Sequence, residues 1–255
     1  MSALRLLLAA VLCAVSCAVV CSPPLAAGAR LRMCVDSHPH PPFIMPDGGG
    51  SAGRLIAAAA RQAGFELEIY QASIARCRAE IGLNLAHGYP TTPYLAELLP
   101  IVDFPMRGGA PDPARATMRS RIMLFRRSGA GVTWDGVRLG GLARPVLVPS
   151  GSLMIPPFLK ALGAPMDVSG QSMAINFVKL MAGRSDSLAG LEDEGERLLR
   201  DPRFAGKIEV LPLPLFEQTY YFAISRDFRA RHGPAVEAMW DAIGRLNQAA
   251  KAHKK

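Results

Sequence analysis

The chain has 255 residues, half of them hydrophobic and 20% charged, which is enough for one large domain or two small ones with buried cores. The formal net charge is +8, but the basic residues are scattered apart from two short runs, and no aromatic residues are interleaved with them. This distribution argues against nucleic-acid binding, and it fits an anionic ligand, an anionic envelope surface or an ordinary solvated surface.

The N-terminal segment has the layout of a secretory signal peptide. One basic residue precedes an apolar run over residues 6–21, and two prolines and several small residues follow. We expect residues 1–29 to be removed by cleavage after Ala29, with Ala27 as the second choice. The alternative is an uncleaved anchor, although the run is shorter than the roughly 20 residues of a comfortable membrane span. A lipoprotein signal ending at Cys17 is a poorer match. The sequence therefore predicts an exported, periplasmic protein with no later membrane span.

Export changes what the five cysteines imply, because three of them leave with the signal and only Cys34 and Cys77 remain. An even pair in an oxidising compartment predicts a disulfide, and two free buried thiols are the alternative. A Cys34–Cys77 bridge would close a loop of about 43 residues and stabilise the fold by roughly 4 kcal/mol on the chain-entropy model.

The first half of the mature chain alternates strand and helix patterns. A strand before a proline cluster, a helix capped by Ser51, an alternating strand and a helix opening near Ser73 are expected over residues 31–35, 52–63, 65–71 and 73–82. Such a βαβ unit implies a parallel sheet with a right-handed crossover. The following stretch, 83–115, is rich in Pro and Gly and weakly patterned.

After Arg121 the strand and helix pattern restarts, which favours two α/β lobes over one. Strands are expected over 116–127, 144–149, 207–213 and 219–225, and helices over 156–164, 172–183 and part of 185–202. The last segment places five apolar residues on one helical face: Val236, Met239, Trp240, Ile243 and Leu246.

Several segments, in this order and spacing, resemble the family 3 periplasmic solute-binding proteins that feed polar amino acid importers. They are "LRMCVDSHPHPPFIMPDG", "AGFELEI", "ARCRAEI", "VLVPSGS", "INFVKLMAGRSDSLAG" and "TYYFAISRDF". The resemblance covers nearly all of residues 30–246, and the two cysteines are similar to a cysteine-containing subgroup.

The resemblance implies a two-lobed α/β fold of the periplasmic-binding-protein type II kind, with a ligand cleft that closes by a hinge. Lobe 1 would hold residues 30–122 and 222–255, lobe 2 would hold 126–216, and the chain would cross near 123–126 and 216–221. Ligands in such sheets lie outside the carboxyl ends of the strands.

The stretch "MCVDSHPHPPF" then follows the first strand, at the edge of that cleft. Cys34, Asp36, His38 and His40 alternate and are all metal-ligand types, but the intervening prolines break the strand, so we predict no metal site. A cysteine nucleophile with a histidine base is disfavoured because the thiol would be in a disulfide. We expect a rigid loop in which Asp36, His38 and Phe43 contact ligand.

Two further candidates lie in lobe 2 and at the second crossover. The turn Ser150–Gly151–Ser152 would present N–H groups and hydroxyls to a carboxylate or phosphate, or it would only cap the next helix. Tyr220 and Tyr221 alternate on a strand, and we expect Tyr220 to reach the cleft.

The sequence departs from the resembling family at two ligand positions. Tyr94 stands where these proteins use an arginine for the α-carboxylate, and Leu191 stands where they use an aspartate for the α-amine. Glu192 is the adjacent acid, but a one-residue shift on a strand turns a side chain to the other face. Arg76 is the expected replacement anion contact, with a surface salt bridge as the alternative.

We therefore expect a non-enzymatic binding protein for a small polar solute, in the finer version an anionic one, that serves a membrane transporter or sensor. No cofactor, metal or nucleic acid is expected. One alternative is a cyclohexadienyl-dehydratase-like enzyme, for which Glu192, His38 and Asp36 are the acid–base candidates. The other is a degenerate lobe pair that acts as an interaction module.

Overall fold

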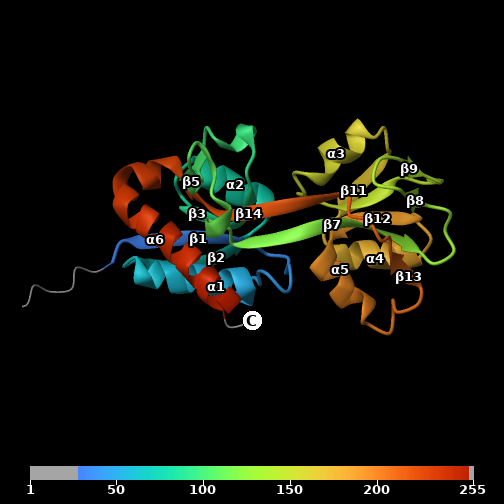
Figure 1. The fold of residues 1–255 in the computed structure, drawn as a ribbon, viewed down its shortest axis with the longest axis horizontal. Helices are drawn as coiled ribbons and strands as arrows, with labels where there is room; N and C mark the ends of the chain where they lie inside the picture. The colour runs from blue at the N-terminus through green and yellow to red at the C-terminus, as the bar shows by residue number, and fades with distance from the viewer. Residues whose placement is uncertain (1–27, 253–255) are drawn as a thin grey trace, which may run out of the picture.

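The computed structural model describes residues 28–252, so most of the expected signal peptide lies outside the described part. This part folds into two α/β lobes that lie side by side (Figure 1). Within it, no helix combines the length and the apolar character that a membrane crossing needs.

Lobe 1 contains the first βαβ unit and the C-terminal helix. Its elements are β1 (Arg30–Asp36), α1 (Gly50–Gln62), β2 (Glu66–Ala72), α2 (Ile74–Gly82), β3 (Gly88–Pro93), η1 (Ala96–Leu98), β4 (Val102–Asp103), β5 (Met106–Arg107), β6 (Ala110–Pro111), η2 (Pro113–Arg115) and α6 (Arg226–Ala252). β1 and β2 are parallel and in register throughout, which confirms the predicted crossover.

Lobe 2 repeats the alternation of strands and helices. Its elements are β8 (Thr133–Trp134), β9 (Leu139–Gly140), β10 (Val146–Pro149), α3 (Ile155–Ala161), β11 (Met166–Gly170), α4 (Met173–Met181), β12 (Ser187–Leu191), α5 (Glu192–Leu199) and β13 (Ile208–Val210). The side chain of Ser172 accepts from the N–H of Ile175, as the sequence predicted for the cap of α4.

Two long strands join the lobes, β7 (Met118–Arg127) and β14 (Phe216–Ser225), and they run antiparallel along the middle of the molecule (Figure 1). They pair with each other from Met118 opposite Tyr220 to Ile122 opposite Phe216. Beyond that segment β7 pairs with β12, and β14 pairs with β3. The lobes therefore share one curled sheet, with strand order β11-β10-β12-β7-β14-β3-β1-β2, instead of having two separate sheets.

Each lobe keeps its own hydrophobic core on either side of this pair of strands. In lobe 1, α1 and α6 pack against β1 and bury the predicted apolar face of α6, where Val236, Met239, Trp240 and Ile243 are fully buried. The indole N–H of Trp240 donates to the carbonyl of Phe222 over 2.9 Å, so this large side chain is buried with its polar atom satisfied. Lobe 2 has cores on both faces of its sheet.

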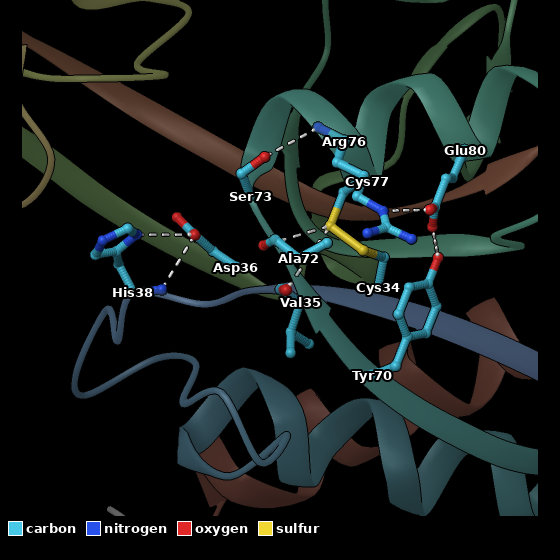
Figure 2. The surroundings of a disulfide bond; sticks show 10 residues. All are labelled: Cys34, Val35, Asp36, His38, Tyr70, Ala72, Ser73, Arg76, Cys77 and Glu80. Carbon is cyan, nitrogen blue, oxygen red and sulfur yellow. Dashed lines mark hydrogen bonds and ion pairs between the residues drawn. A yellow bond between two sulfur atoms is a disulfide. The ribbon is translucent and has the colours of Figure 1, made fainter.

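The predicted disulfide is confirmed and ties α2 to β1. Cys34 and Cys77 are bonded, with 5.6 Å between their Cα atoms, and both are fully buried (Figure 2). The hydroxyl of Ser73 accepts from the N–H of Arg76 and caps α2, at the position where the sequence predicted that a helix begins. The cap predicted at Ser51 is wrong, because α1 begins one residue before Ser51 and has Gly49 as its N-cap, without a side-chain hydrogen bond. The disulfide and the Ser73 cap fix the rotation of α2 about its axis. That rotation decides whether Arg76 or Arg78 reaches the space between the lobes.

Candidate functional site: the cleft between the lobes

A cleft of about 150 Å³ lies between the lobes, bounded by the joining strands. Its lining is largely apolar and comes from both sides, with Phe43, Ile74 and Tyr89 among the contributors from lobe 1 and Met173 and Leu191 among those from lobe 2. The charged side chains of the lining are His40, Arg78 and Glu194. A site with a mostly apolar wall and few placed polar groups is typical of small-molecule binding.

One polar contact closes the mouth of the cleft between α2 and the turn after β10. The Nη2 of Arg78 donates to the carbonyl of Gly151 over 2.9 Å. Gly151 has a φ of +80°, and a Cβ built on it would lie 2.8 Å from the Cδ1 of Ile74. Glycine suits that backbone conformation, and a larger residue would also require the end of the Ile74 side chain to move.

A second polar contact joins Asp36 and His40 of lobe 1 to Glu194 of lobe 2. The Nε2 of His40 lies 2.9 Å from the Oδ2 of Asp36, and its Nδ1 lies 3.8 Å from the Oε2 of Glu194. The loop holds the ring in place, because His40 and Ile44 exchange both backbone hydrogen bonds. The imidazole thus stands between a buried carboxylate on each side.

The surroundings favour the protonated form of His40. Burial alone would lower the pKa of His40, but the hydrogen bond to Asp36 and the interactions with Glu194 outweigh it and raise that pKa to about 9. Burial would raise the pKa of Asp36, yet hydrogen bonds from His40 and from the N–H of His38 hold it below its usual value. At neutral pH His40 is therefore the cation of this contact.

Arg78 has a different environment. Burial in the cleft wall lowers its pKa, with only weak opposition from Tyr89 and Glu97. Among residues 28–252, no carboxylate forms an ion pair with it. Its guanidinium has five N–H donors, and the carbonyl of Gly151 takes one of them.

Five of the residues expected from the sequence line the cleft: Phe43, Ser150, Gly151, Ser152 and Tyr220. Two of the backbone donors that we expected from the turn are engaged within lobe 2, because the N–H of Ser150 donates to Gly170 and that of Ser152 donates to Pro149. The helix that follows is short and opens with prolines.

The other predicted contacts lie outside the cleft lining. Asp36 is buried behind it and accepts from the N–H of His38, whose ring lies beside it (Figure 2). Tyr94 packs edge-on against Phe104 within lobe 1.

Arg76 and Glu192 are engaged in ion pairs outside the cleft lining. Arg76 is largely exposed and pairs with Glu80, which also accepts from the hydroxyl of Tyr70 (Figure 2). Glu192 pairs with Arg121, whose Nε lies 2.7 Å from its Oε2.

Arg78 was not among the residues expected at the site, although the spacing of apolar residues on α2 carries a signal for it. Ile74, Arg78 and Ile81 are spaced i, i+4 and i+7, so they share one helix face, and all three line the cleft. Arg76 lies about 200° around the helix axis from Arg78.

Within the described residues, no three His, Cys, Asp or Glu side chains are grouped in a way that could hold a metal ion.

No protein-family model and no curated protein matches the chain. Solved structures do match it. The GluR0 ligand-binding core from Nostoc punctiforme, in complex with L-glutamate, is 15% identical with a TM-score of 0.67, over 88% of this chain and 96% of that one. AbpA from Streptococcus pneumoniae, an amino acid ABC transporter substrate-binding protein bound to L-arginine, is 18% identical with a TM-score of 0.67, over 89% and 92%.

The periplasmic VFT2 domain of BvgS from Bordetella pertussis matches as well, at 14% identity with a TM-score of 0.63, over 88% and 94%. At such identities the likeness shows the fold. The chain has the two-lobed α/β fold of periplasmic binding proteins, which confirms the fold that the sequence resemblance implied.

Proposed function

We infer that the protein is an exported, non-enzymatic binding protein that captures a small solute between its lobes in the periplasm. The observation that carries this proposal is the cleft itself, walled by both lobes and crossed by the contacts Arg78–Gly151 and His40–Glu194. A solute held by both walls favours the closed arrangement, because it binds the closed lobes better than the open ones.

A membrane transporter or a sensor is the partner that we propose for this protein. The neighbouring folds include a substrate-binding protein of an ABC transporter and a histidine kinase sensor domain, and both kinds of protein support this choice. In either role, the closed lobes would be the form that the partner recognises.

The proposal is tested by ligand-dependent stabilisation of the mature chain. A panel of small organic acids, amides, amines and amino acids is screened by thermal melting, and a bound solute raises the Tm by mass action. Small-angle X-ray scattering on each hit then measures closure, and we expect a smaller radius of gyration. A folded protein that responds to no member of the panel contradicts the proposal.

The same panel addresses the enzymatic alternative. Glu194 is the sole carboxylate of the cleft lining, and it faces His40. We therefore propose that a bound cyclic acid such as prephenate leaves the cleft unchanged. Release of a new product, followed by chromatography, would favour the dehydratase instead.

A further inference from the structure

The strongest charge feature of the cleft is a guanidinium without a carboxylate partner. A partly desolvated charge is costly unless hydrogen bonds and an opposite charge compensate it. Arg78 donates to one acceptor, the carbonyl of Gly151, and among residues 28–252 no carboxylate lies within ion-pair distance of it, so Glu97 acts on it only from farther away. Burial already lowers its pKa. An anion bound beside it would supply the missing charge.

The surroundings of Arg78 describe the anion more closely. Ser150 and Ser152 line the cleft on the opposite lobe and flank Gly151, whose carbonyl accepts from Arg78. A guanidinium facing hydroxyl groups suits a carboxylate, which accepts two parallel hydrogen bonds from arginine and further ones from serine.

The rest of the cleft limits the size and polarity of the solute. Its volume is about 150 Å³, close to that of an engineered apolar cavity that holds benzene, so a body of roughly four to eight non-hydrogen atoms fits. Phe43, Met173 and Leu191 contribute to the wall around that body. These side chains favour a hydrocarbon tail over a polar one.

Among the described residues that line the cleft, Glu194 is the one carboxylate that could pair with an ammonium group. The protonated ring of His40 lies 3.8 Å from it, so an ammonium group would compete with that cation. Leu191 is part of the wall beside α5. The α-amine of an amino acid would thus lose its water without gaining a free carboxylate.

We propose, on the basis of the function inferred above, that the solute is a small monocarboxylate with an apolar body and no amine, and that Arg78 binds its carboxylate. The guanidinium supplies the charge, the serine hydroxyls of the turn complete the hydrogen bonds, and the apolar wall takes the tail. The cleft selects such an acid over both its amide and its α-amino derivative.

The preference of the cleft for an acid over its amide and its α-amino derivative is tested with three compounds of the same carbon skeleton. These are 3-methylbutanoate, 3-methylbutanamide and L-valine, and their binding is measured by calorimetric titration at pH 7. We expect the acid to bind at least about tenfold more tightly than the amide, since it alone makes charge-assisted bonds. We expect L-valine to bind more weakly than the acid by at least a similar factor, about tenfold.

Variants on one helix assign the effect to Arg78. Arg78→Gln should weaken binding of 3-methylbutanoate by at least about tenfold and change that of the amide by less than about threefold. Arg78→Lys should restore part of the preference for the acid. Arg76→Gln is the matched control, because Arg76 lies two residues away and pairs with Glu80, and it should change both affinities by less than about twofold.

Equal binding of acid and amide, tighter binding of L-valine, or full acid binding by Arg78→Gln would overturn this inference. Each of these results would still be compatible with the proposed function, the capture of a solute in the cleft. A chain that binds none of the wider panel of acids, amides, amines and amino acids overturns the proposed function instead, so the two failures are distinguishable.

Discussion

His40 and Glu194 face each other across the interlobe cleft, with 3.8 Å between the Nδ1 of the ring and the Oε2 of the carboxylate. The other nitrogen of the same ring lies 2.9 Å from Asp36. One imidazole thus links the end of β1 in lobe 1 to α5 in lobe 2. Because the link depends on a proton, the stability of the closed arrangement depends on pH.

The pKa of His40 rises from 6.5 to about 9 in this setting. A raised pKa means that the interaction is fully present below pH 6.5 and is lost as the pH rises through about 9. We expect the free energy of unfolding to fall between these limits by on the order of 2–3 kcal/mol from this group. Denaturant unfolding at several pH values from 6 to 10 measures it.

The variant His40→Gln keeps a hydrogen-bonding side chain but removes the titrating ring. Its unfolding free energy should be lower at pH 6.5 and should vary less with pH up to 9.5, so the two curves converge at high pH. If the unfolding free energies of the wild-type protein and the variant changed with pH in parallel, protonation of His40 would not contribute to stability.

The disulfide should contribute to stability in proportion to the loop that it closes. Replacing Cys34 and Cys77 together with alanine should lower the free energy of unfolding by up to about 4 kcal/mol, because the unfolded chain regains the entropy of a loop of 43 residues. Guanidinium unfolding measures the loss. An unchanged unfolding midpoint would contradict this estimate.

The wild-type protein provides the control for that experiment. Both sulfurs are fully buried, so a reductant should open the bond only after unfolding, and the reduced protein should unfold at the midpoint of the double variant. We also expect the double variant to bind solute more weakly, since the bridge fixes the helix that carries Arg78.

Much of the fold could be predicted from the sequence because its elements carry local signals. The apolar face around Trp240, the start of a helix at Ser73 and the cap Ser172 are all found where the pattern placed them. The strand β3 was missed because Pro90 and Pro93 fall within it. Only its first residue, Gly88, pairs with β1, and its pairing with β14 is irregular and skips Pro90, so the strand tolerates the prolines.

The site could be predicted less well because it depends on pairs that the sequence does not bring together. Glu194 meets His40 only after β7 and β14 have set the two lobes against each other. The choice between Arg76 and Arg78 depends on the rotation of α2, which the buried disulfide fixes from β1. Helix periodicity around Ile74 places Arg78 on the face of α2 that lines the cleft, whereas the sequence motif had pointed to Arg76, which lies outside the cleft lining.

Gly151 should act as a spacer that allows the lobes to close. In Gly151→Ala the new methyl group would lie 2.8 Å from the Cδ1 of Ile74 on the opposite lobe, and the φ of +80° would be strained as well. We expect weaker binding of 3-methylbutanoate, by about threefold to tenfold, and a larger radius of gyration. Calorimetry and small-angle scattering measure the two effects.

Two further variants distinguish the backbone strain at Gly151 from the steric clash with Ile74. Gly163 also has a positive φ, +68°, but nothing lies within 4 Å of its would-be Cβ, so Gly163→Ala should lower the Tm and leave binding unchanged. Combining Gly151→Ala with Ile74→Ala removes the colliding group and should recover part of the lost affinity, which a double-mutant cycle quantifies. Strictly additive losses would mean that Gly151 and Ile74 do not meet when the lobes close.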